Sequence, residues 1–432
     1  MKSAFRDVLL EKEFSRPLSY FRREQTCPLL PHKALAVIGI RRSGKTTFLR
    51  QVWDDLLRTD PARQERLVYV NFFDERLFNL QARQLGELLE AYYELHPGVG
   101  PRETLYFFLD ELQVVNGWEY FVDRLLRARH RVFISGSSAT LLSKEIASSM
   151  RGRSLSVEIF PFSFREVLAA EKKATAELGP RERAIALGRF KEYLAQGGFP
   201  ETLAVEPPLR RRLLQDYLDA VLLRDIIERH NPSDPSAISH LLHLLMNQVG
   251  STCTINKSCE RLKAQGLKVN KPEISRAMDW FHDSYLFFSV PILSNSAHKR
   301  IVNPKKLYCI DTGMAHHQAL SASNDWGHLL ENAIFLHLRR QTEAICYFKD
   351  AQQREVDFVI QKPEKGCGLI QVAWSLQNPE TRRREIDALH SAMSALSVKD
   401  ATLVTLDEQE EIRSSGKTIH VRPAWSFLLG DG

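Results

Sequence analysis

Short apolar runs alternate with helical stretches along the first part of the chain. The clearest apolar runs lie at 34–38, 105–109 and 131–134, and a more mixed one spans Ser154–Phe160. Runs of this length that end in polar residues are typical of strands buried in a parallel sheet. Helical patterns follow at Thr47–Trp53 and Ala139–Met150. Strands that alternate with helices predict an α/β fold.

The first apolar run leads directly into a phosphate-binding motif. Residues 39–46 read Gly-Ile-Arg-Arg-Ser-Gly-Lys-Thr and match G-x-x-x-x-G-K-[ST] in full. A strand, a glycine loop and a helix N-terminus form a pocket of backbone N–H groups, and the helix dipole favours an anion there. Lys45 is expected to reach the β- and γ-phosphates of ATP, and the Thr46 hydroxyl to ligate Mg²⁺. The expected nucleotide-binding residues are Gly39, Arg41, Arg42, Ser43, Gly44, Lys45, Thr46 and Thr47.

The next two apolar runs end in residues suited to nucleotide chemistry. After the second run come Asp110, which is expected to hold Mg²⁺, and Glu111, which is expected to orient and polarise the attacking water. After the third run come Ser135 and Ser137. Either serine could hydrogen-bond the γ-phosphate or the water, or the turn could cap the following helix.

Composition narrows the class of protein. A chain of 432 residues with 44% hydrophobic and 26% charged residues is expected to be globular, with roughly two to four domains. The six cysteines are scattered and form no C-x-x-C pair, which argues against a zinc ribbon or a disulfide framework. The chain shows neither an apolar signal core nor an apolar run of about 18 residues. We therefore expect a cytoplasmic protein without a membrane partner.

The order of these motifs resembles the AAA-type P-loop ATPases of bacteria and archaea. Two later motifs, Phe160–Glu166 and Gly197–Glu201, extend the resemblance. Such proteins carry a helical lid, a winged helix and a restriction-endonuclease-like α/β domain related to PD-(D/E)xK nucleases, and most have no assigned biological role. The implied domains are an ATPase core at 1–165, a lid at 166–235, a winged helix at 236–322 and a nuclease-like domain at 323–432.

The resemblance also implies an arginine finger. In AAA-type ATPases an arginine just before the fifth core strand reaches the nucleotide of the neighbouring subunit. Arg151 and Arg153 hold that place in this chain, and a guanidinium there can neutralise charge on the transferred phosphoryl group. A homo-oligomer, such as a hexamer, is therefore expected. The alternative is a basic surface turn.

The segment 236–310 has the pattern and the charge of a DNA-binding module. It contains ten Lys/Arg and four Asp/Glu, a net charge of +6 that equals the net charge of the whole chain. Lys271 and Arg276 are expected at the start of a recognition helix, and Lys299 and Arg300 at the tip of a wing, where they would contact DNA phosphates. The alternative is a winged helix used for packing or oligomerisation. The predicted elements are helices at 237–249, 257–265 and 272–283 and strands at 285–290 and 301–310.

The C-terminal domain departs from the nuclease pattern. The resemblance implies that Glu331 and Asp357 supply two of the carboxylates of such a nuclease. The third carboxylate and the lysine, however, are replaced by Gln371 and Ala373. Because an amide oxygen is a weak Mg²⁺ ligand and alanine offers no charge, we expect a scaffold without nuclease chemistry.

These observations favour a Mg²⁺-dependent ATPase that couples hydrolysis to DNA binding or remodelling. Two alternatives stay open. One is a nucleotide-dependent switch that binds a protein partner without DNA, and the other is an ATP-gated nuclease. DNA stimulation of hydrolysis would separate the first two functions, and the Gln371 and Ala373 departure argues against the third.

Overall fold

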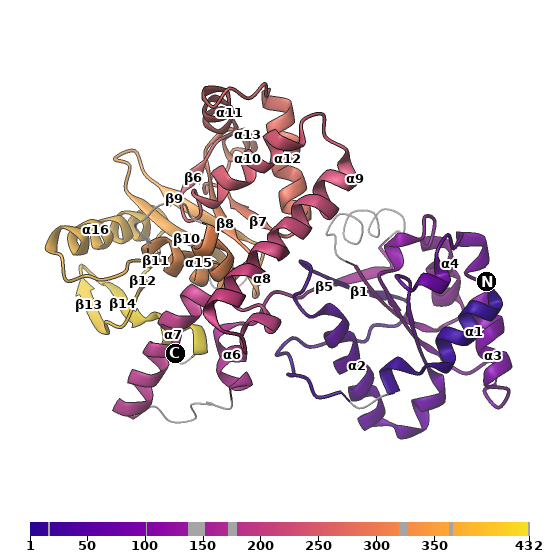
Figure 1. Cartoon of the computed structure of the whole chain (residues 1–432). Coiled ribbons are helices and arrows are strands. Elements are labelled where there is room, and N and C mark those ends of the chain that lie inside the picture. Colours follow the sequence, from indigo (N-terminus) through magenta and orange to yellow (C-terminus); the bar gives the residue numbers. More distant parts are fainter. Residues whose placement is uncertain are drawn as a thin grey trace. The chain divides into compact units, whose positions relative to one another are not determined.

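The computed structural model describes residues 1–15, 18–100, 102–136, 152–171, 179–318, 326–362 and 366–430. The chain forms two compact units, Met1–Phe160 and Pro161–Gly432 (Figure 1). The predicted helix 139–150 and two predicted site residues, Ser137 and Arg151, lie outside the described residues. Over the ranges that are described, no helix is long and apolar enough to cross a membrane.

The first unit is built on a parallel sheet, as the apolar runs predicted. Its strands lie in the order β2-β3-β4-β1-β5, and every neighbouring pair is parallel. The carboxyl ends of parallel strands meet at one edge of a sheet, which is where ligands bind in open α/β folds. The strands are β1 (Ala34–Ile38), β2 (Leu67–Asn71), β3 (Tyr106–Asp110), β4 (Arg131–Ser135) and β5 (Ser154–Glu158).

Helices cover this sheet with apolar faces. Helix α2 buries Phe48, Val52 and Trp53 in a core cluster that includes Val37 of β1 and Phe133 of β4. This packing fixes the start of α2 against the ends of the central strands, because the helix begins directly after the glycine loop. The helices described here are α1 (Lys2–Leu10), α2 (Lys45–Thr59), α3 (Glu87–Leu95) and α4 (Glu119–Arg127).

The second unit begins with helices, and its two family motifs lie against each other. The Phe162 amide donates to the Gly198 carbonyl at 2.6 Å. A Cβ on Gly198 would lie 2.2 Å from the Phe162 carbonyl oxygen, so only glycine fits there. Helix α8 continues directly into a π-helical stretch, Val221–Ile227. The helices are α6 (Phe164–Ala170), α7 (Pro180–Gln196), α8 (Pro207–Ala220) and α9 (Glu228–His230).

A helical segment with a small antiparallel sheet, β6-β8-β7, follows. One predicted boundary is wrong here: the expected strand 301–310 starts only at Lys305, because residues 301 and 302 end a short helix, α13. This helix also carries Lys299 and Arg300, in the connection between β7 and β8. The Ser296 side chain accepts from the Lys299 amide and caps α13, which accounts for the helical start. The elements are α10 (Pro235–Met246), β6 (Thr252–Cys253), α11 (Ile255–Ala264), α12 (Lys271–Asp283), β7 (Phe287–Val290), α13 (Ala297–Val302) and β8 (Lys305–Cys309).

The C-terminal part contains a mixed sheet in the order β13-β14-β12-β11-β10-β9. Strands β11, β12 and β14 are parallel, and the remaining pairs are antiparallel. Its elements are α14 (Thr312–Gln318), α15 (Trp326–Arg339), β9 (Ile345–Lys349), β10 (Glu355–Lys362), β11 (Gly366–Val372), α16 (Pro379–Ala395), β12 (Asp400–Thr405), β13 (Glu410–Ser414), β14 (Lys417–Pro423) and α17 (Ala424–Leu429).

Candidate functional site

Two glycines shape the loop between β1 and α2. Gly39 has φ +146°, and a Cβ there would lie 2.3 Å from the Ile159 carbonyl oxygen. Gly44 has φ +94° and is the N-cap of α2. Both positions therefore require glycine, for backbone conformation and, at Gly39, also for space. The predicted loop residues 39–47 thus lie together at the N-terminus of α2.

Lys45 is folded into this loop. Its Nζ donates to the carbonyl oxygens of Gly39 at 3.1 Å and Ile40 at 3.0 Å. The side chain is buried even though it is a lysine in the first turn of a helix. An ammonium beside backbone N–H groups at a helix N-terminus creates a strongly positive concavity, which suits a polyphosphate.

An arginine that the sequence did not single out fastens the loop from behind. Arg23 donates to the carbonyl oxygens of Ser43 at 2.9 Å and Phe160 at 2.6 Å. Gln51 of α2 accepts from the Arg23 amide at 2.7 Å. Arg23 therefore connects the loop, α2 and the segment that follows the fifth strand. No motif marks this residue, because it acts on backbone atoms distant in sequence.

Asp110 lies at the centre of the site. It is 2% exposed, and one carboxylate oxygen accepts from the Thr46 hydroxyl at 2.8 Å and from the Tyr69 hydroxyl at 3.2 Å. The other oxygen accepts from the Ser135 hydroxyl. A carboxylate and a hydroxyl oxygen side by side are the hard ligands that Mg²⁺ prefers. The residues present thus fit the metal that the motif implies.

Glu111 is held in a distinct conformation. Its backbone is left-handed, with φ +53° and ψ +35°, and its amide donates to Ser135 Oγ at 3.2 Å. The Glu111 side chain accepts a hydrogen bond from Gln113 Nε2. Ser135 thus contacts both acidic residues from the end of β4, whereas Gln113 was not expected and positions the Glu111 carboxylate.

Arg153, one of the two predicted finger residues, has an ion-pair partner within its own chain. Its guanidinium lies 2.6 Å from Asp123 Oδ1, and its side chain is 48% exposed. Asp123 also pairs with Arg127 at 2.9 Å. Arg153 therefore lies on the surface of the first unit, with its guanidinium tied to α4.

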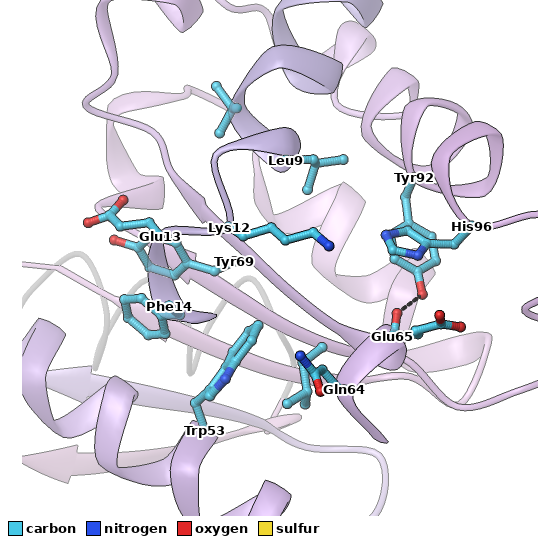
Figure 2. A pocket seen from close by; sticks show the side chains of 12 residues that line it. Leu9, Lys12, Glu13, Phe14, Trp53, Gln64, Glu65, Tyr69, Tyr92 and His96 are labelled. Atoms are coloured by element: carbon cyan, nitrogen blue, oxygen red, sulfur yellow. Dashed lines mark hydrogen bonds between the residues drawn. The ribbon is translucent and has the colours of Figure 1, made fainter. Parts of the chain in front are cut away.

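Tyr69 also lines a cavity of about 300 Å³ (Figure 2). Trp53 and Tyr92 contribute to its wall, and Phe14 stacks on Tyr69 with 3.7 Å between the ring centroids. Burial and the Asp110 carboxylate raise the pKa of Tyr69 well above its ordinary value. The hydroxyl therefore stays protonated and donates a hydrogen bond to Asp110. None of the loop residues 39–47 lines this cavity, so it is separate from the phosphate loop.

The four predicted DNA contacts are all exposed. Lys271 is the first residue of α12, whose N-cap Asn270 forms a capping box with Glu273. Arg276 lies one and a half turns further along the same helix. Lys299 and Arg300 lie on α13 beside two exposed apolar residues, Ile301 (72% exposed) and Val302 (64%).

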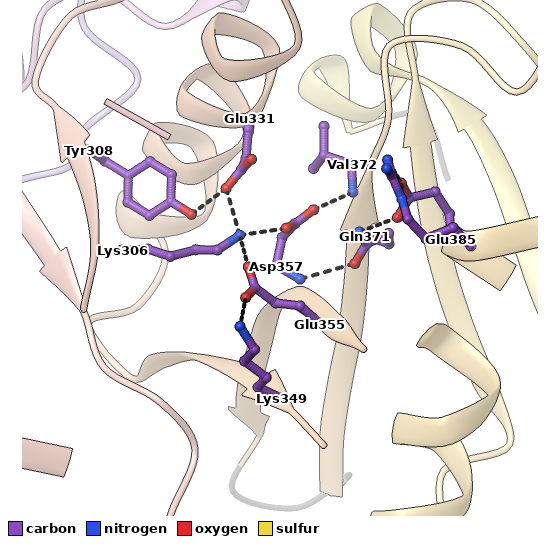
Figure 3. A network of polar contacts seen from close by, with 10 residues as sticks. Lys306, Tyr308, Glu331, Lys349, Glu355, Asp357, Gln371, Val372 and Glu385 are labelled. Atoms are coloured by element: carbon purple, nitrogen blue, oxygen red, sulfur yellow. Dashed lines mark hydrogen bonds and ion pairs between the residues drawn. The ribbon is translucent and has the colours of Figure 1, made fainter. Parts of the chain in front are cut away.

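The residues of the expected nuclease pattern lie close together in the second unit, but with an unexpected lysine among them (Figure 3). Lys306 Nζ lies 3.0 Å from Glu331 and 2.6 Å from Asp357. Gln371 accepts from the Asp357 amide at 3.0 Å. Lys306 belongs to the +6 of segment 236–310 but is buried, so it adds nothing to the surface charge of that segment. Ala373 lies in the hydrophobic core of the C-terminal sheet.

Electrostatics keep this lysine charged. Burial alone lowers the pKa of Lys306, but the nearby carboxylates, Asp357 foremost, outweigh burial and raise it well above its ordinary value. Burial and then the Asp357 carboxylate raise the pKa of Glu331 to about 7. The cluster thus holds more acids than cations, and Lys306 carries its central positive charge.

The parallel sheet, the glycine loop and the Thr46–Asp110 contact define a P-loop NTPase. Residues 31–168 match a family described as an AAA domain, and residues 187–325 and 326–427 match two families described as domains of unknown function. An uncharacterized protein of Methanocaldococcus jannaschii is 34% identical over 448 residues, covering 99% of this chain and 96% of that protein. The chain belongs to the same family, a family of AAA-type P-loop ATPases.

More distant relatives and structures were also found. An uncharacterized protein of Haemophilus influenzae is 27% identical over 356 residues, covering 82% of this chain and 85% of that protein. The Walker-type ATPase of Pyrococcus abyssi matches with a TM-score of 0.42 and 13% identity, covering 74% of this chain and 95% of that one. The ORC2 protein of Aeropyrum pernix, solved as ADPNP–ADP complexes, matches with a TM-score of 0.38 and 12% identity, covering 78% of this chain and 94% of that one.

Proposed function

We propose that this protein binds ATP with Mg²⁺ and hydrolyses it in the first unit. The observation that carries the proposal is the 2.8 Å hydrogen bond from Thr46 to Asp110, which joins the phosphate loop to the acidic end of β3. These two residues would hold Mg²⁺, which neutralises phosphate charge when bound. Lys45 would bind the β- and γ-phosphates from within the loop.

Glu111 is the proposed general base. Its left-handed backbone turns it away from the strand direction of Asp110, and Gln113 holds its carboxylate. In this arrangement Asp110 is buried and committed to hydroxyl partners, whereas Glu111 is partly exposed. Two adjacent acids thus have different environments and can serve different roles, one in metal binding and one in activating water.

We further propose that an arginine acts in trans within a homo-oligomer. Arg153 supports this role because its side chain is exposed and the residue lies directly before β5. Arg151 stays an equal candidate from its place in the sequence. The Arg153–Asp123 pair lies on the surface, where ion pairs contribute little to stability. The Arg153 guanidinium can therefore leave Asp123 and pair with a phosphoryl group at a small cost in free energy.

The second part of the proposal is DNA binding by residues 236–322 as a winged helix. Exposed Lys271 and Arg276 on α12, and Lys299 and Arg300 on α13, support it. Exposed Ile301 and Val302 next to the latter pair add an apolar surface of the kind that some architectural proteins insert between bases. A surface with both basic and apolar residues also suits binding of a protein partner. The rival function is therefore a nucleotide-dependent switch that binds a protein and not DNA.

One experiment separates these functions. The ATPase rate is measured at low salt without DNA and with single-stranded, duplex and branched DNA. Stimulation by any of these supports coupling to DNA, whereas a DNA-independent rate favours the protein-partner switch. Absence of hydrolysis under all conditions would contradict the ATPase proposal itself. We also propose a lid at 166–235 and an α/β domain at 323–432, the latter without nuclease activity because Gln371 and Ala373 replace an acid and a lysine.

A further inference from the structure

Three carboxylates from two elements surround one ammonium in the second unit (Figure 3). Lys306 Nζ, on β8, lies 2.6 Å from Asp357, 2.9 Å from Glu355 and 3.0 Å from Glu331. Glu331 comes from α15, and the other two acids come from β10. The ammonium donates hydrogen bonds to Glu331 and Asp357, and Glu355 lies within ion-pair distance of it.

The position of Lys306 is fixed by the strand that carries it. The side chain of Asn332 on α15 exchanges two hydrogen bonds with the backbone of Cys309 on β8, at 2.8 Å and 3.0 Å. Tyr308 donates to Glu331 at 2.7 Å and stacks on Phe335 with 4.3 Å between centroids. These contacts hold the part of β8 that follows Lys306 against α15, so packing fixes the position of the ammonium.

Neighbouring groups satisfy the other polar atoms of the cluster. The second oxygen of Asp357 accepts from the Val372 amide at 2.8 Å. Gln371 bonds the Asp357 amide with its oxygen and Glu385 with its nitrogen, at 3.0 Å and 2.6 Å. The Gln371 amide is therefore engaged at both ends, in contacts that orient Asp357 toward Lys306.

The spacing of the cluster is that of an ammonium rather than a divalent metal. The N–O distances of 2.6–3.0 Å exceed the Mg²⁺–oxygen distance of about 2.0–2.1 Å, and two of the three exceed the Ca²⁺–oxygen range of about 2.3–2.6 Å. A cation is nevertheless required, because buried carboxylates without a partner are strongly destabilising.

We propose that Lys306 is a tethered cation that takes the place of a metal ion in this cluster, so that the C-terminal sheet carries a closed cation site served by the chain's own ammonium. Tethering removes any dependence on free metal, and it excludes divalent ions by charge and by occupancy. This inference does not depend on nucleotide hydrolysis or on DNA binding.

Chemical rescue tests the proposal. In Lys306→Ala the missing atoms correspond to propylammonium, and the side chain of Glu355, 27% exposed, gives a route from solvent. We expect Lys306→Ala to have a lower melting temperature than the wild type, and propylammonium chloride to raise it. Tetramethylammonium chloride, which has no N–H donor, should not do so. Lys305→Ala, on the same strand but partly exposed, should be close to wild type and show no rescue.

A second arm needs no lysine variant. The melting temperature of the nucleotide-free, full-length protein is measured with and without MnCl₂, for the wild type and for Glu331→Gln. Any shift caused by MnCl₂ should be the same in both proteins. A rise that Glu331→Gln abolishes would mean that the cluster binds divalent metal and would overturn the proposal. The proposal would also be overturned if Lys306→Ala melted at the wild-type temperature. The same holds if Lys306→Ala were destabilised but propylammonium did not raise its melting temperature. If Lys306→Ala fails to fold, Lys306→Ala/Glu355→Gln, with one acid fewer, undergoes the same rescue test.

Discussion

The Thr46 hydroxyl donates to Asp110 at 2.8 Å across 64 residues of sequence. This contact places the first helical turn after the phosphate loop directly against the acidic end of a neighbouring strand. The Tyr69 hydroxyl donates to the same Asp110 oxygen from β2. Side chains from β2, from the end of β4 and from the first turn of α2 therefore converge on one carboxylate at the end of β3.

Substitutions in the phosphate loop and at the proposed base should have different effects. Lys45→Ala should abolish hydrolysis and weaken ATP binding, because it removes the ammonium from the loop. Glu111→Gln should keep ATP bound but slow turnover by roughly 10²-fold or more, since it removes the base. Nucleotide binding by fluorescence and steady-state ATPase assays measure the two effects. Wild-type turnover in Glu111→Gln would show that the base lies elsewhere.

Subunit mixing tests the finger. If Arg151 or Arg153 acts in trans, specific ATPase activity should rise with protein concentration as subunits associate. Mixing Arg151→Ala/Arg153→Ala with Lys45→Ala should restore part of the activity, because each subunit supplies what the other lacks. Each variant alone at the same total concentration is the control. A strictly monomeric protein by light scattering, with concentration-independent activity, would refute a trans-acting arginine.

Charge reversal tests the DNA surface. Lys271→Glu/Arg276→Glu, and separately Lys299→Glu/Arg300→Glu, should weaken binding to all DNA sequences. Each lost phosphate contact should reduce the slope of log affinity against log salt by about 0.9. Fluorescence anisotropy over a salt series measures both effects. Arg383→Glu, at a side chain that is 85% exposed on α16, is the matched control; an equal effect there would mean nonspecific charge attraction.

The pH dependence of stability tests a buried acid beside the second family motif. Asp311 accepts from the amides of Gly198 at 2.6 Å and Met314 at 2.8 Å, and burial raises its pKa from 3.8 to about 6. The folded state thus binds this proton more tightly than the unfolded state. The stability that it contributes is present below pH 4 and is lost as pH rises through about 6.

Asp311→Asn does not titrate and leaves a buried amide poorly paired, so it should be less stable than the wild type at pH 4. The difference should shrink by up to about 3 kcal/mol by pH 7. Urea denaturation at each pH measures it, with Asp400→Asn, 72% exposed, as control. A difference that stays constant or grows with pH would contradict the buried, proton-binding state of Asp311.

The sequence alone determined the phosphate loop and the acidic strand end. Gly39, Gly44 and Lys45 form a local motif, since a glycine loop and a helix start depend on backbone conformations within a few residues. The apolar runs likewise predicted β1, β3, β4 and β5 of the parallel sheet, because burial on both faces leaves a continuous apolar signature. Strand β2 (Leu67–Asn71) was not predicted. Burial could not be inferred for Lys306, because a lysine adds a charge to the composition wherever it lies.

Tertiary structure decided which distant residues serve these local motifs. Tyr69 reaches Asp110, Arg23 reaches the carbonyl of Ser43, and Lys306 enters an acidic cluster 25 to 51 residues further along the chain. Each is a single side chain without a spacing pattern, and its partner is set by sheet order and packing. Sequence periodicity reports the environment of neighbouring residues along one element, whereas these pairings depend on how separate elements meet, and only the folded chain brings them together.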